Sequence, residues 1–132
     1  MTDSLPSAQK SGEPGSSLLN TAKGLEYSDN DPDFYRELLR LFTEEAPKSL
    51  ERLSSALADN DLELYTTLVH GLKNNARGIG ADSAGELCFE AEQTARAGNA
   101  APLPELHLKI EQAITEAAAE AARLSEAEKI TQ

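Results

Sequence analysis

Apolar positions along most of the chain recur every three or four residues, the period of an α-helix with one buried face. Between residues 31 and 60 this stripe consists of Phe34, Leu38, Leu41, Phe42, Leu50, Leu53 and Leu57. Asp31 and Pro32 suit the start of the helix, because an aspartate accepts hydrogen bonds from free amides and a proline is tolerated in the first turn. Pro47 interrupts the ladder, so the segment is either one kinked helix or two helices that meet near Ala46.

A second long helix is predicted from Asp61 to about Gly78. Asn60 and Glu63 resemble a capping box at its start, and Gly80 can supply the left-handed backbone that ends a helix. Its expected buried arc consists of Leu64, Tyr65, Leu68, Val69, Leu72 and Ala76.

Two more helices are predicted towards the C-terminus. Ser83 and Glu86 repeat the capping pattern at the start of a helix that ends at Gly98, and its buried stripe consists of Ala84, Leu87, Cys88, Ala91 and Ala95. Pro102 precedes the last helix, expected over residues 102–129. The apolar positions of that helix are Leu103, Leu106, Ile110, Ala113, Ala117, Ala121 and Leu124.

The N-terminal part has a different pattern. Residues 1–14 are rich in Ser, Pro and Gly and are expected to form a flexible tail or linker before a domain over residues 15–132. A short helix over residues 16–23, ending at Gly24, would pack Leu18 and Leu19 against that domain. Short connections favour antiparallel neighbours. The sequence therefore predicts an all-α fold, an antiparallel up-and-down four-helix bundle with an additional short N-terminal helix.

Composition supports this fold and narrows the function. The 132 residues suffice for one domain, and aromatic residues make up only 5%, which favours packed helices over sheets. With 12 basic and 23 acidic side chains the net charge is −11, so nucleic acid and anionic membranes are not expected as partners. No apolar run is long enough for a membrane span or a signal core, which predicts a cytoplasmic protein. The single cysteine, Cys88, is expected to be a small core residue.

The candidate chemistry lies at His70. On a helical wheel this residue falls opposite the centre of the buried arc, so its imidazole is expected to be exposed. The residues nearest to it on the wheel are Glu63, Thr66, Thr67, Lys73, Asn74 and Arg77. An exposed histidine can also be a merely solvated residue. Gly71 beside it either lets another molecule approach closely or only allows tight helix packing.

Other chemistries find little support in the sequence. The only other histidine, His107, lies on a different predicted helix without metal-ligand spacing, so no metal site is expected. No glycine-rich phosphate loop follows a strand, and no serine stands in a nucleophile turn.

The segment VHGLKNNARGIGA, residues 69–81, resembles the signature of histidine-phosphotransfer (HPt) domains, which is His-x-Leu-Lys-Gly followed by small residues and a Gly-Ala ending. The matching residues are His70, Leu72, Lys73, Ala76, Gly80 and Ala81. Flanking segments extend the resemblance over about residues 18–100; they are Gly24-Leu25, Asp31-Pro32-Asp33-Phe34-Tyr35, Leu87-Cys88 with Glu92, and Gly98-Asn99. The sequence departs from the signature at Asn74, where the family most often has glycine.

This resemblance implies a role in a bacterial two-component phosphorelay. His70 would accept a phosphoryl group from the aspartate of a response-regulator receiver domain and pass it to another receiver. The chain would be a monomeric phosphocarrier rather than an enzyme with a kinase domain, and a hybrid sensor histidine kinase would be a further partner. The chain would need no cofactor, because the Mg²⁺ ion belongs to the receiver.

The resemblance also implies roles for neighbouring residues. Lys73 and Arg77 would attract the phosphoryl group, and Asn74 would either narrow access to the imidazole or donate a hydrogen bond to that group. Glu92 would hold the other ring nitrogen, unless it is an ordinary solvated glutamate. The expected receiver-binding residues are Thr66, Thr67, Gly71, Lys73, Asn74 and Arg77.

Two alternatives to this function remain. One is an HPt-like docking module that binds or inhibits a kinase or receiver without phosphotransfer. The other is an unrelated four-helix enzyme or metal carrier, which would need a Glu-x-x-His pair that this sequence lacks.

Overall fold

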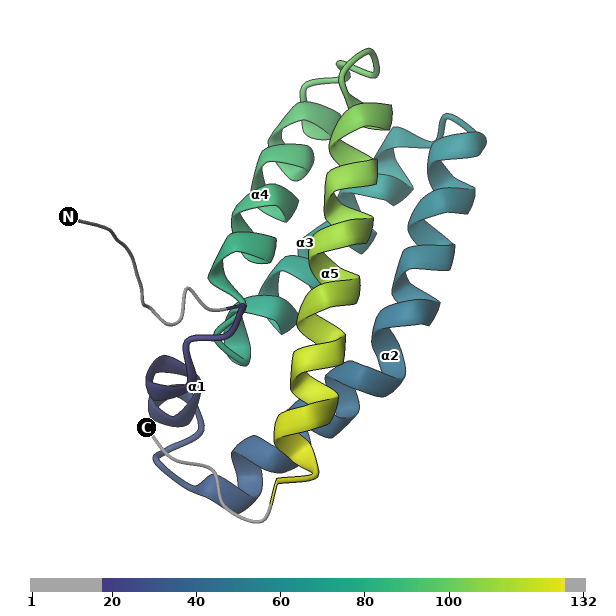
Figure 1. The fold of residues 1–132 in the computed structure, drawn as a ribbon. Helices are drawn as coiled ribbons and strands as arrows, with labels where there is room; N and C mark the ends of the chain where they lie inside the picture. Colours follow the sequence, from purple (N-terminus) through teal and green to yellow (C-terminus); the bar gives the residue numbers. More distant parts are fainter. Residues whose placement is uncertain (1–17, 128–132) are drawn as a thin grey trace, which may run out of the picture.

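The computed structural model describes residues 18–127, a span built from five α-helices without a strand (Figure 1). They are α1 (Thr21–Tyr27), α2 (Pro32–Ala58), α3 (Leu62–Gly78), α4 (Asp82–Arg96) and α5 (Leu103–Ser125). Each of the four long helices packs against two others, in the cyclic order α2, α3, α4, α5. The predicted up-and-down bundle with a short additional helix is confirmed. The predicted tail over residues 1–14 lies outside the described residues, and the last helix ends at Ser125, before the predicted end at residue 129.

The helix α2 begins at its predicted cap and continues through Pro47. The Asp31 carboxylate accepts hydrogen bonds from the amides of Asp33 and Phe34 at 3.0 and 3.3 Å, with Pro32 in the first turn. Of the two possibilities for this segment, the structure has the single helix, which changes direction near its middle (Figure 1).

Neither predicted capping box forms. Asn60 lies in the turn before α3 with a left-handed φ of 55°, and the carboxylate of Asp61 caps the helix by accepting a backbone hydrogen bond at 3.1 Å. The helix α4 begins at Asp82, before Ser83, without a side-chain cap. Gly80 supplies the left-handed residue predicted after α3, with a φ of 90°.

The short helix α1 lies further along the chain than predicted. The sequence placed it over residues 16–23 with Gly24 as its end, whereas Gly24 lies in the middle of α1. This glycine serves packing rather than helix termination, because a Cβ atom there would lie 2.5 Å from the ring of Tyr35. Of the two leucines expected to pack against the bundle, Leu19 is buried and Leu18 is 44% exposed.

The buried face of α2 is rotated by one residue from the predicted stripe at its N-terminal end. Phe34 and Leu41 are largely exposed, whereas Tyr35 and Leu39 are fully buried. Tyr35 explains the rotation, because its hydroxyl donates a hydrogen bond of 2.8 Å to the carbonyl of Ile79, at the end of α3. This bond connects the start of α2 to the turn that follows the His70 helix.

Two residues with potentially reactive side chains, His107 and Cys88, are buried in the core. The imidazole of His107 on α5 is buried, with Nδ1 and Nε2 each 3.0 Å from a hydroxyl, those of Tyr65 and Ser54 respectively. Cys88 is buried, as predicted for a small core residue, and burial raises the pKa of its thiol to about 12. Neither residue presents a reactive group to solvent.

Gly24→Ala is expected to lower the free energy of unfolding by about 1–3 kcal/mol, because the added methyl group overlaps the Tyr35 ring. Gly71→Ala is the matched control. Apart from the backbone of α3 itself and the adjacent residues, no atom of residues 18–127 lies within 4 Å of its added Cβ, so alanine should stabilise α3 by about 0.5–1 kcal/mol. Urea unfolding followed by circular dichroism measures both values, and equal effects would contradict the packing role of Gly24.

Candidate functional site

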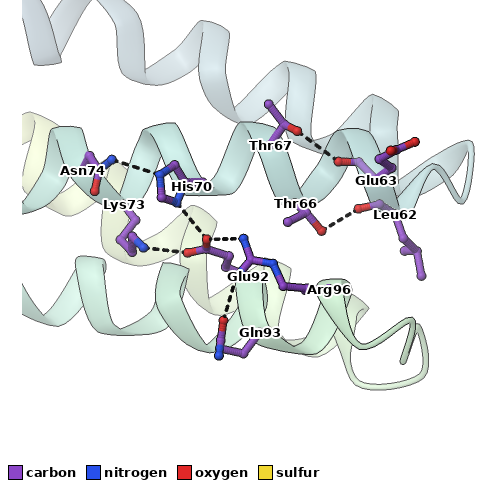
Figure 2. Close-up of polar contacts among 10 residues, drawn as sticks. All are labelled: Leu62, Glu63, Thr66, Thr67, His70, Lys73, Asn74, Glu92, Gln93 and Arg96. Carbon is purple, nitrogen blue, oxygen red and sulfur yellow. Dashed lines mark hydrogen bonds and ion pairs between the residues drawn. The ribbon is translucent and has the colours of Figure 1, made fainter.

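His70 lies on the exposed face of α3, and Glu92 from the neighbouring helix α4 contacts its ring (Figure 2). The imidazole is 51% exposed, as the helical wheel predicts. Its Nδ1 atom lies 2.8 Å from Oε2 of Glu92. The glutamate itself is buried, with 2% of its side chain exposed, so it is not an ordinary solvated residue. Of the two readings of Glu92, the geometry matches the one in which it holds a ring nitrogen.

The buried carboxylate of Glu92 is ionised. Burial alone would raise its pKa, but the hydrogen bonds from Lys73 and His70 outweigh burial and lower the pKa from 4.5 to about 2. An ionised carboxylate only accepts hydrogen bonds, so the hydrogen shared with His70 belongs to Nδ1. In a neutral imidazole this arrangement leaves the reactive lone pair on Nε2.

Lys73 is not the exposed cation that the helical wheel predicts. Its side chain is only 10% exposed, and Nζ lies 2.7 Å from Oε1 of Glu92, the oxygen that does not contact His70 (Figure 2). Phe89 of α4 covers the same ammonium group, with 5.4 Å between Nζ and the ring centre. The prediction considered one helix alone, whereas a buried carboxylate on the next helix requires a paired charge.

Arg77 is directed towards α4. Its guanidinium lies 3.5 Å from the carboxylate of Glu86 and 5.7 Å from the ring centre of Phe89. A Cβ atom added at Gly85 would lie 2.8 Å from its Cγ, so the stem of the arginine also rests on α4. These contacts hold Arg77 away from the position beside His70 that the sequence suggested.

Arg96 is a cation that the sequence reasoning missed. Its guanidinium lies 3.0 Å from Oε2 of Glu92, the same oxygen that accepts the hydrogen bond from His70 (Figure 2). The arginine side chain is 59% exposed. The spacing of four residues between Glu92 and Arg96 on one helix was the available signal. One carboxylate thus faces two permanent cations, Lys73 and Arg96, which places excess positive charge beside His70 in a strongly acidic chain.

The other predicted residues lie along the exposed face of α3. The hydroxyls of Thr66 and Thr67 donate to backbone carbonyls one turn back, at 2.7 and 3.3 Å (Figure 2). Gly71 has no neighbour within 4 Å of an added Cβ among the described residues, so tight helix packing does not explain the glycine. Asn74 is exposed, and its Nδ2 atom lies 3.4 Å from Nε2 of His70.

Within residues 18–127, no group of three or more His, Cys, Asp or Glu side chains is placed to hold a metal ion. The metal-carrier alternative therefore has no ligand cluster in this part of the chain. Over the same span, no helix is both long and apolar enough to cross a membrane.

The fold and the site together define a class of protein, a four-helix bundle that presents one exposed histidine whose Nδ1 atom is held by a buried acid. The chain belongs to the Hpt domain family, whose family model matches residues 37–120. This membership confirms the resemblance found in the sequence.

Two solved structures share the fold. One is histidine-containing phosphotransfer protein B (HptB) from Pseudomonas aeruginosa PAO1, with 21% identity and a TM-score of 0.77. The other is the HPT domain from the Hpt Sensor Hybrid Histidine Kinase from Shewanella, with 20% identity and a TM-score of 0.76. Each match covers 85% of this chain and 97% of the other chain. A comparison with curated proteins found no match.

Glu92→Gln is expected to lower the free energy of unfolding at neutral pH by on the order of 3 kcal/mol, because it leaves Lys73 buried without its counter-charge. The folded-state pKa of Glu92 is lowered, so its stabilising contribution is fully present above pH 4.5 and is lost as the pH falls towards 2. The difference in stability between wild type and variant should therefore narrow across that window. Urea unfolding at a series of pH values measures it.

Glu90→Gln is the control for this experiment, because Glu90 is an exposed residue of the same helix. Its effect should stay within about 0.5 kcal/mol at every pH. A wild-type advantage over Glu92→Gln that persists undiminished to about pH 2 would contradict the assigned ionisation of Glu92.

Proposed function

We propose that this protein is a phosphorelay intermediate in which His70 accepts a phosphoryl group from the aspartate of one receiver domain and passes it to another. Membership of the Hpt family supports histidine phosphotransfer in general. The observation that carries the assignment to His70 is the hydrogen bond from Nδ1 to the buried Glu92. It leaves Nε2 as the nucleophilic atom on an exposed face of the bundle.

The proposed transfer needs no other covalent group from this chain. The Nε2 lone pair attacks the phosphorus of the aspartyl phosphate, a bond forms between Nε2 and phosphorus, and the bond from phosphorus to the aspartate oxygen breaks. The aspartate leaves as a carboxylate, and the Nδ1 proton stays on the ring. The phosphorylated ring then carries formal positive charge, which the ionised Glu92 stabilises through the existing hydrogen bond. Transfer to the next receiver reverses these steps.

Arg96 is the cation best placed to meet the phosphoryl group. Lys73 is buried against Glu92, and Arg77 is held over α4. Arg96 is exposed and shares a carboxylate oxygen with His70, so a rotation of its long side chain carries the guanidinium towards the phosphoryl oxygens. A guanidinium binds phosphate oxygens well because its donors form a planar fork. We assign Lys73 the separate role of holding Glu92 in place.

The partners in this scheme are receiver domains and a hybrid sensor histidine kinase. The similar structure from Shewanella is the HPT domain of a sensor hybrid histidine kinase, which supports such a kinase as a partner. Beside Asn74, an apolar groove runs between α2 and α3, and its apolar lining consists of Leu38, Leu41, Phe42, Ala46, Leu72 and Ile79. Exposed apolar surface bordering a reactive side chain suits a protein partner. The Mg²⁺ ion that neutralises the transferring group would belong to the receiver.

A docking module that binds a receiver or kinase without phosphotransfer is the second candidate function. The observation in its favour is the contact between Asn74 and Nε2 of His70, since a lone pair that accepts a hydrogen bond is less available for attack.

Incubation with a radiolabelled phosphorylated receiver tests the proposed function. The wild type is expected to acquire acid-labile, alkali-stable label, and His70→Gln is expected to acquire none, because it lacks the nucleophilic Nε2. Binding of the receiver without label on the wild type would overturn the proposal in favour of the docking module. Equal label on both proteins would assign the reaction to a residue other than His70.

Arg96→Ala is expected to slow transfer from the receiver about tenfold, because a charge-assisted contact to the phosphoryl group is lost. Arg96→Lys should recover part of the rate. Arg123→Ala is the matched control, since it removes an exposed arginine that pairs with Glu120 on α5, and it should leave the rate unchanged. Initial rates measure all three variants. A larger loss in Arg77→Ala than in Arg96→Ala would restore the assignment suggested by the sequence.

A further inference from the structure

Asn74 occupies the position in front of the reactive nitrogen of His70. It follows the histidine by one helical turn, and its Nδ2 atom lies 3.4 Å from Nε2 (Figure 2). In the neutral imidazole Nδ1 carries the only ring hydrogen, so Nε2 offers a lone pair and the Asn74 amide is the donor in this contact. The two ring nitrogens are thus both engaged, one by Glu92 and one by Asn74.

The two engagements have different strengths. The bond to Glu92 is short and is made to a buried, ionised carboxylate. The bond from Asn74 is long and lies on the exposed face of α3, where water competes for both groups. The first contact therefore persists while the second is easily broken. The Nε2 lone pair cannot attack phosphorus while it accepts a hydrogen bond, so the contact with Asn74 competes with that attack.

The position of Asn74 also connects the histidine to the apolar groove between α2 and α3. Its side chain lines that groove together with Leu38 and Leu41 from α2. A protein that fills the groove meets Asn74 at the same time as it approaches His70. A small phosphate donor leaves the groove empty and meets the amide still in place.

We propose that Asn74 is a removable mask on Nε2, which slows phosphorylation of His70 by small phosphodonors and is displaced when a receiver docks in the adjoining groove. This proposal rests on the proposed function, because it concerns the same histidine. The chemical consequence is selectivity: phosphoryl groups enter through a docked receiver in preference to free acyl phosphates or phosphoramidates.

Nitrogen-15 NMR of the histidine ring tests the mask without any phosphate. In Asn74→Ala, the Nε2 resonance of the neutral ring is expected to move towards that of a fully solvated imidazole nitrogen, because water replaces the amide as its hydrogen-bond donor. Asn75→Ala is the matched control, because Asn75 is the adjacent exposed amide and has no hydrogen bond to the imidazole among the described contacts. It should leave the resonance in place. An unmoved Nε2 resonance in Asn74→Ala would overturn the proposal.

Phosphorylation by phosphoramidate tests the consequence. A bond forms between Nε2 and phosphorus, the phosphorus–nitrogen bond breaks, and ammonia leaves from the protonated amine while the Nδ1 proton stays on the ring. Asn74→Ala is expected to react about two- to five-fold faster than wild type, whereas transfer from a phosphorylated receiver should change less than about two-fold. Asn75→Ala should match wild type with phosphoramidate.

The remaining outcomes are also decisive. An unchanged or slower reaction of Asn74→Ala with phosphoramidate overturns the mask, because the Asn74 amide then has no effect on the rate of phosphorylation or increases it. Equal acceleration with both donors overturns its release by docking. A wild type that reacts with phosphoramidate but never with a receiver refutes the proposed function instead. In that case the NMR experiment still tests the hydrogen bond between Asn74 and His70, because it uses no phosphate.

Discussion

The ionised carboxylate of Glu92, buried between two helices, is the constraint on which the site depends. A charge removed from water is tolerated only when it is paired and hydrogen-bonded, and this one has partners on both oxygens. Lys73 supplies the buried counter-charge, and His70 and Arg96 share the other oxygen. Because these partners come from both α3 and α4, the carboxylate holds the two helices in one register and the imidazole in one orientation.

The rest of the bundle holds that register from outside the site. At the end of α3, the Tyr35 hydroxyl binds the Ile79 carbonyl, and Gly24 leaves room for the Tyr35 ring under α1. Further along the bundle, His107 connects α3 and α5 through Tyr65. These contacts are distant from His70, yet they hold the helix that carries it. Such supporting contacts keep the helix that carries a functional side chain in one position.

The surroundings of His70 differ on its two sides, one of which is charged and the other apolar. On the α4 side lie the ionised Glu92 and its two cationic partners, the buried Lys73 and the exposed Arg96, which together place net positive charge beside His70 in a chain that is otherwise strongly negative. On the α2 side lie Asn74 and the apolar groove, which suit a protein surface. The imidazole of His70 sits between these two sides, with Nδ1 bonded to Glu92 and Nε2 next to Asn74.

The sequence by itself determined the features that depend on local spacing. The helical period, the Asp31 cap, the left-handed Gly80 and the exposure of His70 all follow from residues close together in the chain. Local spacing does not predict three other features: the burial of Lys73, the contact of Arg96 with Glu92 and the rotation of the buried face of α2. Each of these features depends on which face of one helix packs against the next helix. The buried carboxylate of Glu92 fixes the positions of the two cations, and the hydroxyl of Tyr35 fixes the buried face of α2. Only the tertiary structure decided which cation is buried and which is exposed beside Glu92, because burial and pairing are properties of the contact between helices.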